Sequence, residues 1–201
     1  MCQDSLVCLT AEGCFLKFRT KTKKIDSPEE VREQGIIPPR VVRAEAVFSS
    51  DRLYRFQLEL HLKRRPASWC MFLLLNPSTA TAFQLDPTVR RTVGFAEDWG
   101  YEGVLIGNAF AYRSTKPGVL RKVADPTGQR NDQHLEFMAK KADLVVCGWG
   151  NNGLLYDRSS SVLRLLRELG VQPWALKTNE KTGQPTHPLY LSSDLMPSIP
   201  L

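Results

Sequence analysis

The sequence predicts an α/β protein, with three α/β/α layers, a central mostly parallel sheet and a β-hairpin on its N-terminal side. Short apolar runs that stop at polar loops alternate with amphipathic stretches of helical period. This rhythm is typical of a parallel sheet covered by helices on both faces. Ahead of these runs, a segment of alternating apolar and polar residues predicts two antiparallel strands.

The hairpin is predicted over residues 44–62, with its turn at Ser49, Ser50 and Asp51. In the second arm the apolar residues alternate with a polar set that includes Arg55 and His61. One face of the hairpin is therefore expected to be buried. Because His61 falls on the polar face, we expect it at the surface and not in a catalytic site.

The segment from Cys70 to Gly100 organises the rest of the chain. Residues 71–75 are a continuous apolar run, typical of a strand buried on both faces, and the run stops at a polar loop, residues 76–79. Pro77 stiffens this loop, so we expect the Asn76 amide to be aimed into a crevice. Asp86 is expected to cap a helix that ends near Trp99 and Gly100.

Further strands are predicted over residues 103–109, 143–148 and 171–176. Helices are predicted over residues 131–141, with Asn131 as a cap, and over 158–169, ending at Gly170; a short helix begins at Pro117. In open α/β sheets, ligands bind outside the carboxyl ends of the strands. The loops that follow these strands are therefore expected to share one crevice.

Composition limits the function classes. The net charge of +6 permits an anionic partner such as DNA or a nucleotide, but does not require one. The sequence contains no apolar segment long enough for a membrane span and no export signal, so we expect a cytoplasmic protein without a membrane partner. Five cysteines without zinc-ligand spacing predict neither disulfides nor a metal, and no cofactor motif is recognisable.

Two regions are expected. Residues 1–43 form an N-terminal basic extension that contains the run Lys17 to Lys24, and residues 44–201 form a single α/β domain. A solvated charged segment is a simpler interpretation of the basic run than a phosphate contact.

Candidate site residues follow from the predicted loops. Asn76 and His187 are the candidate catalytic residues, because each stands beside a proline in a loop expected at the crevice. For Asp86 and its neighbouring arginines, capping and solvation are an equally good explanation as contact with an anionic substrate. The residues expected to bind substrate are Pro77, Ser78, Thr79, Phe83, Asp86, Arg90, Arg91, Asn108, Tyr112, Arg113 and Trp149.

Several of these motifs closely resemble a bacterial and phage family known only as a domain of unknown function. The matching blocks, in order, are FLLLNPSTA, DPTVRR, WGYEG, NAFAYRSTKP, DPTGQRND, GWG and GQPTHPLYL, and the resemblance extends from about Ala44 to Pro197. Leu85 departs from the acidic residue expected before Asp86. This departure argues against a metal or acid–base role that needs a pair of carboxylates.

At greater distance the plan is similar to the uracil-DNA glycosylase superfamily. Asn76-Pro77 looks like the first motif of its mismatch-specific branch, and His187-Pro188-Leu189 looks like the late motif. The resemblance implies a glycosylase-like fold, in which the first motif places the attacking water and the late motif supports the departing base and the DNA.

Three function classes remain open. In the first, an enzyme hydrolyses an N-glycosidic bond: Asn76 orients water, His187 stabilises charge on the leaving base, and Phe83 or Tyr112 stacks on that base. In the second, the same crevice binds nucleic acid or a nucleotide without catalysis, because an asparagine cannot act as a general base. The third is a small-molecule hydrolase or transferase. The sequence leaves the oligomeric state open.

Overall fold

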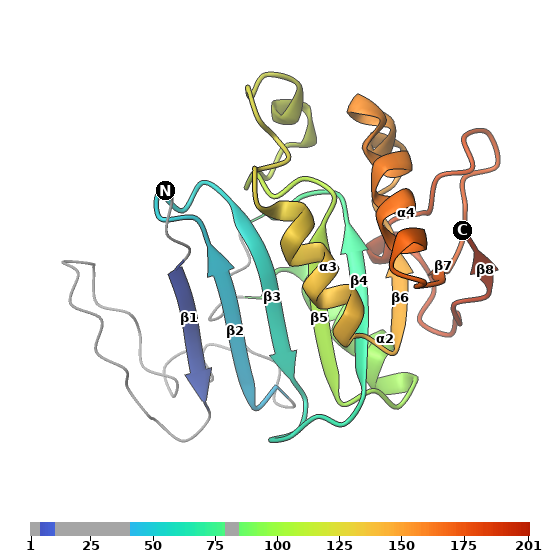
Figure 1. Ribbon diagram of the computed structural model, residues 1–201. Coiled ribbons are helices and arrows are strands. Elements are labelled where there is room, and N and C mark those ends of the chain that lie inside the picture. Colours follow the sequence, from blue (N-terminus) through green and yellow to red (C-terminus); the bar gives the residue numbers. More distant parts are fainter. Residues whose placement is uncertain (1–4, 11–40, 79–84) are drawn as a thin grey trace.

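The computed structural model describes residues 5–10, 41–78 and 85–201 (Figure 1). The described strands form one sheet in the order β1-β2-β3-β5-β4-β6-β7-β8. Their bounds are β1 Ser5–Thr10, β2 Arg43–Phe48, β3 Arg55–His61, β4 Trp69–Leu74, β5 Gly103–Asn108, β6 Leu144–Cys147, β7 Pro173–Ala175 and β8 Ile199–Pro200.

The centre of the sheet is parallel, and its two sides are antiparallel. Strand β4 pairs in parallel with both β5 and β6, and β6 pairs in parallel with β7. The hairpin strands β2 and β3 are antiparallel to each other, and β3 pairs antiparallel with β5. Strand β8 is antiparallel to β7. The expected mixed α/β architecture with a parallel centre is therefore present. The very short β8 was not predicted.

Helices cover both faces of the sheet, which gives the three expected layers (Figure 1). Helix α2 (Pro87–Asp98) packs with Phe72 and Ile106 on one face. Helices α3 (Asn131–Lys141) and α4 (Arg158–Glu168) pack with Met71 and Leu105 on the other. Three 3₁₀ turns complete the described elements: η1 (Pro117–Arg121), η2 (Asn151–Asp157) and η3 (Pro188–Tyr190).

Strands β4 and β5 are buried along their whole length because both of their faces are covered by helices. Within β5, Gly107 lets α3 approach closely: a Cβ there would lie 2.7 Å from Cδ2 of Leu135 and 3.0 Å from Cε of Met138. The dense packing on both faces holds the carboxyl ends of these strands in a fixed relation to each other.

Strand β3 contains a β-bulge that changes the face of the sheet on which Arg55 lies. Phe48 pairs with Arg55, whereas Val47 pairs with Gln57, so a β-bulge lies between the two pairs. A bulge inserts one extra residue, so the side chains before and after it no longer follow one alternation between the two faces. Arg55 therefore shares the α2 face with Phe48 and not the face of Gln57, which contacts His134 of α3.

The expectation of a surface His61 is wrong. The residue is 7% exposed, and its ring packs edge-on against Trp69. Its Nε2 lies 2.8 Å from Oε1 of Glu59, which also accepts from Lys141 at the end of α3. The polar face of β3 is thus covered by α3, a tertiary contact that the alternating pattern does not reveal.

The N-terminal side of the sheet includes β1, which comes from the segment expected to be an extension and pairs antiparallel with β2. The basic run over residues 17–24 lies outside the described residues. No helix in the described part of the chain is long and apolar enough to cross a bilayer.

Candidate functional site

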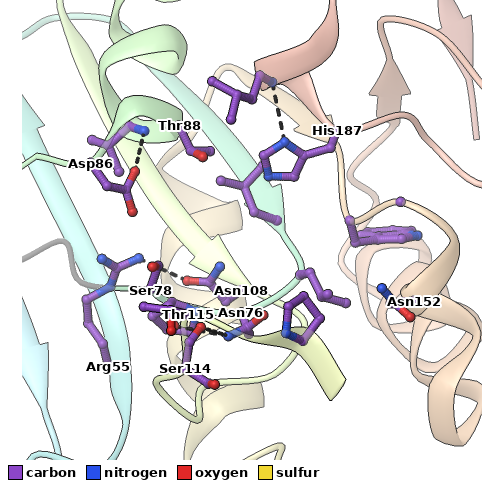
Figure 2. A pocket seen from close by; sticks show the side chains of 18 of the residues that line it. Arg55, Asn76, Ser78, Asp86, Thr88, Asn108, Ser114, Thr115, Asn152 and His187 are labelled. Carbon is purple, nitrogen blue, oxygen red and sulfur yellow. Dashed lines mark hydrogen bonds between the residues drawn. The ribbon is translucent and has the colours of Figure 1, made fainter. Parts of the chain in front are cut away.

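A pocket of about 410 Å³ opens at the carboxyl ends of β4, β5 and β6 (Figure 2). It also reaches the first turn of α2 and the loop before η3. Its lining residues are Arg55, Leu74, Leu75, Asn76, Pro77, Ser78, Asp86, Thr88, Val89, Asn108, Ser114, Thr115, Pro117, Trp149, Gly150, Asn151, Asn152, His187, Leu189 and Tyr190. This volume lies within the range of small-molecule binding sites.

The loops that follow β4 and β5 are joined by hydrogen bonds. The Ser114 backbone NH donates to the carbonyl oxygen of Pro77 at 2.8 Å. The Asn76 Nδ2 donates to the carbonyl oxygens of Pro77, at 3.0 Å, and Ser114, at 2.8 Å. Both amide hydrogens of Asn76 are thereby used, so the atom that this side chain can offer a ligand is the acceptor Oδ1.

His187 contributes a donor to the same pocket. Its Nδ1 accepts a hydrogen bond from the Leu189 backbone NH at 3.3 Å. Burial lowers the pKa of His187, while the negative charge of Asp86 acts in the opposite direction. A neutral imidazole that accepts at Nδ1 carries its proton on Nε2. His187 therefore presents an Nε2–H donor on the side of the pocket opposite Asn76 (Figure 2).

Asp86 is the only carboxylate among the described lining residues. It is the N-cap of α2, and its Oδ1 accepts from the Val89 backbone NH at 2.9 Å. Pro87 at the first helical position fixes the start of the helix, as the sequence indicated. One carboxylate oxygen thus caps the helix, and the negative charge stays at the wall of the pocket.

Arg55 was not among the expected site residues, yet it lines the pocket with only 2% of its surface exposed. Its Nη2 donates to Oδ1 of Asn108 at 3.1 Å. Burial lowers its pKa to about 10, partly offset by the charge of Asp86, so the guanidinium is still charged at neutral pH. Because Asn108 accepts from Arg55 through Oδ1, its Nδ2 donors remain for a ligand.

Asn131 holds Asn108 in place from behind. The sequence suggested that Asn131 is a helix cap, but it is the first residue of α3, after the cap Arg130. Its Nδ2 donates to the carbonyl oxygens of Asn108, at 2.9 Å, and Ala109, at 3.2 Å. The side chain therefore fixes the carboxyl end of β5, which carries a pocket residue.

The loop after β6 forms another wall. Trp149 is 2% exposed, and its Nε1 donates to Oε1 of Gln184 at 2.7 Å, which binds this loop to the C-terminal segment. Gly148 lets the two segments meet, because a Cβ there would lie 2.7 Å from Cδ of Pro188. The loop therefore helps to place His187, the neighbour of Pro188.

Seven of the residues predicted from sequence line this one pocket: Asn76, Pro77, Ser78, Asp86, Asn108, Trp149 and His187. Thr79 and Phe83 lie outside the described residues. The structure places the two residues separated most in sequence, Asn76 and His187, in one site.

Four expected residues do not line the pocket. Arg90 donates from Nε to the carbonyl oxygen of Leu85, and Arg91 contacts the carbonyl oxygen of Leu191. Tyr112 packs edge-on against Tyr54. Arg113 donates from Nη1 to the carbonyl oxygen of Arg52 at 3.0 Å and lies over the Phe48 ring. Arg90 is held by a local contact five residues away. The other three are directed by tertiary contacts, which their places in a loop or helix did not indicate.

Besides Arg55, several polar lining residues were not among the predicted site residues: Thr88, Ser114, Thr115, Asn151 and Asn152. Four of them lie in loops already expected at the crevice, so the signal was present. Among the described residues, no group of three His, Cys, Asp or Glu side chains is arranged to hold a metal ion.

A family model described as "Protein of unknown function (DUF1643)" matches residues 55–189, more than half of the chain. The matched range begins at Arg55 and ends at Leu189, so it contains every residue that lines the pocket except Tyr190. No curated protein and no solved structure matches the chain. The chain belongs to the DUF1643 family of proteins of unknown function.

Proposed function

We propose that the protein hydrolyses the N-glycosidic bond of a base in DNA or a nucleotide, with the base held in the pocket. The observation that carries this proposal is the convergence of Asn76 and His187 with complementary hydrogen-bonding roles. Asn76 offers an oriented acceptor, and His187 offers an oriented neutral donor. An acceptor for water on one side and a donor for the leaving group on the other are what such a hydrolysis needs.

In the proposed reaction, Oδ1 of Asn76 accepts a hydrogen bond from a water molecule and so orients it towards the sugar carbon. As the bond between sugar and base breaks, Nε2–H of His187 donates to the departing base and stabilises its negative charge. Asp86 accepts the proton that the attacking water loses, because it is the only carboxylate among the described lining residues. The released base anion then takes a proton from solvent, and Asp86 returns its proton to solvent. The products are the free base and a sugar with a hydroxyl at the former point of attachment.

The distant resemblance of Asn76-Pro77 and His187-Pro188-Leu189 to glycosylase motifs supports the same reaction class. Fold analogy alone does not establish a reaction, so the pocket geometry carries the proposal. The test is incubation with DNA that contains uracil, mismatched or modified bases, and with nucleotides. Abasic sites are detected as alkali-labile breaks, and released bases by chromatography.

Base release is expected from the parent chain and not from Asn76→Ala or His187→Ala. Gln133→Ala is the matched control, because it also removes a side-chain amide, but from an exposed position on α3. The control should keep full activity. If the parent chain releases no base from any substrate of the panel, the glycosylase proposal fails.

A non-catalytic binding module is the second candidate. It is favoured by the chemistry of Asn76, which is neutral, and by the capping role of Asp86, which occupies one carboxylate oxygen. Such a module binds a base or nucleotide in the pocket and releases nothing. Saturable binding without products, lost in Asn76→Ala and kept in Gln133→Ala, would replace the first proposal by this one. Turnover of a metabolite that contains no base would favour a small-molecule hydrolase or transferase instead.

A further inference from the structure

Two arginines outside the pocket share one aromatic ring. The guanidinium carbon of Arg52 lies 4.7 Å from the centre of the Phe48 ring, and that of Arg113 lies 5.1 Å from it. The backbone carbonyl of Arg52 also accepts from Nη1 of Arg113 at 3.0 Å. Both positive charges therefore lie beside the same ring at the turn of the hairpin.

The register of the strands brings Arg55 to the same face. Phe48 stands opposite Arg55 across the hairpin. On the other side, Tyr54 pairs with Tyr112, and the Arg113 backbone NH donates to the carbonyl oxygen of Leu53 at 2.9 Å. Side chains alternate along paired strands, so Arg55 and Arg113 are diagonal neighbours on one face. We call Arg52, Arg113 and Arg55 the arginine row.

The arginine row runs from the surface to the pocket. Arg52 is exposed on the hairpin turn, Arg113 is partly buried, and Arg55 lines the pocket. Residues Ser114 and Thr115, directly after Arg113, line the pocket as well. The row is therefore continuous with the site and does not form a separate patch.

The charges of the row are not balanced by carboxylates at its outer end. In the described part of the chain, none of the ion pairs includes Arg52 or Arg113. The nearby Asp51 carboxylate accepts from Oγ of Ser49 and the Leu53 backbone NH. The pKa of Arg113 is lowered mainly by burial and further by repulsion from Arg52. Adjacent guanidinium groups repel each other, and a bound anion would relieve that repulsion.

We propose that the arginine row is a phosphate-binding track, so that the ligand of the pocket carries phosphate groups beside its base. Guanidinium groups donate to phosphate oxygens in a planar fork, which makes arginine well suited to this contact. The phosphate can belong to a free nucleotide or to a nucleic-acid strand. This inference deepens the proposed function, because it names the substrate class of the same pocket.

The track is tested by binding measurements on the full chain with three probes: a nucleoside, its 5′-monophosphate and a fluorescent single-stranded oligonucleotide. Arg52→Asn and Arg113→Gln remove one charge each. Asparagine suits the positive φ of 60° at position 52, and glutamine keeps hydrogen-bond donors at position 113. Arg164→Ala is the matched control, because it removes an exposed charge from α4 on the opposite face of the sheet.

For the oligonucleotide, each track variant is expected to bind about tenfold more weakly at low salt. Each should also lower the slope of log affinity against log salt by about 0.7, the value for one phosphate contact to a single strand. Arg113→Lys keeps the charge and should keep the slope. If the track serves a free nucleotide, the same variants weaken the monophosphate and leave the nucleoside unchanged. If it serves a strand, they weaken the oligonucleotide alone.

Two results would overturn the track. One is that both variants keep the parent affinity for the monophosphate and the oligonucleotide and the parent salt slope. The other is that Arg164→Ala loses as much affinity as the track variants. If Arg113→Gln does not fold, Arg52→Asn decides alone, since Arg52 is exposed on a turn. The outcome is separable from the proposed function. Salt-dependent binding that the variants weaken, without base release, refutes hydrolysis and supports the track. Base release from nucleotides or DNA that both variants leave unchanged supports hydrolysis and refutes the track.

Discussion

The guanidinium of Arg55 and the side-chain amide of Asn108 form a buried hydrogen bond of 3.1 Å that joins the hairpin strand β3 to the parallel strand β5 at the wall of the pocket. Both residues are 2% exposed. The bond therefore couples the antiparallel hairpin to the parallel centre of the sheet. It lies at the pocket, where these two parts of the sheet meet.

Arg55→Met is expected to lower the free energy of unfolding by about 1–3 kcal/mol, because Oδ1 of Asn108 loses a buried donor. Asn108→Ala should have a loss of similar size. If the two residues act as a pair, the double variant loses less than the sum of the two single losses. Urea denaturation of the four proteins measures these values. Strictly additive losses would contradict a direct coupling between the two side chains.

Asn131→Ala is expected to lower the free energy of unfolding by about 1–3 kcal/mol, because the carbonyl oxygen of Asn108 loses its donor from Nδ2. The Ala109 carbonyl oxygen is less affected, since Nε of Arg158 also donates to it. Gln133→Ala, on the exposed side of the same helix, should stay within about 0.5 kcal/mol of the parent. Equal effects of the two variants in urea denaturation would show that Asn131 has no special role.

Much of the fold could be predicted because its signals are local. Helix α3 has the expected bounds, and Asp86 caps α2 as expected, because capping and helical period depend on neighbouring residues. Strand β8 consists of two residues and pairs with a strand of three, so it has no periodic signal of its own. Its position depends on where the C-terminal segment packs.

The site was predicted only in part, for a physical reason visible at two arginines. Arg55 was assigned to a polar face, but the bulge in β3 reverses its direction and turns it to the pocket. Arg91 was expected at the crevice, but its guanidinium lies over the Phe95 ring and contacts the C-terminal segment. The position of a loop can be predicted from the local sequence. The direction of a long side chain depends on contacts with residues far away in the sequence.

The structure predicts a pH dependence at His187. Its unfolded form takes up a proton near pH 6.5, whereas burial lowers the pKa in the folded protein. Between these two values the unfolded chain binds more protons, so stability rises with pH there. The contribution of His187 is complete above pH 6.5 and is lost as pH falls towards the folded pKa. Because the proposed reaction uses the neutral ring, the rate of base release should decrease at pH values below the folded pKa of His187.

This dependence can be measured by an NMR titration of the imidazole protons. The chain has three histidines, so His187→Gln assigns the signal. Asp86→Asn should lower the pKa of His187 further, because the charge of Asp86 raises it. Asparagine is an equally good N-cap, so helix α2 should be kept. A His187 pKa at or above 6.5 in the parent chain would show that the charge of Asp86 outweighs burial, which contradicts the predicted lowering.

Gly148→Ala tests whether the loop after β6 positions His187. A Cβ at this position would lie 2.7 Å from Cδ of Pro188 and 3.5 Å from the carbonyl oxygen of Thr186, so the segment that carries His187 must move. The variant is expected to lose about 1–3 kcal/mol of unfolding free energy, the usual cost of overpacking. It should also shift the NMR signal and the pKa of His187. Gly118→Ala is the control, because its added Cβ would meet no atom within 4 Å apart from its local backbone. If Gly148→Ala leaves the His187 signal and its pKa at their parent values, then Pro188 does not transmit the position of this loop to the pocket, and His187 is held by its own segment alone.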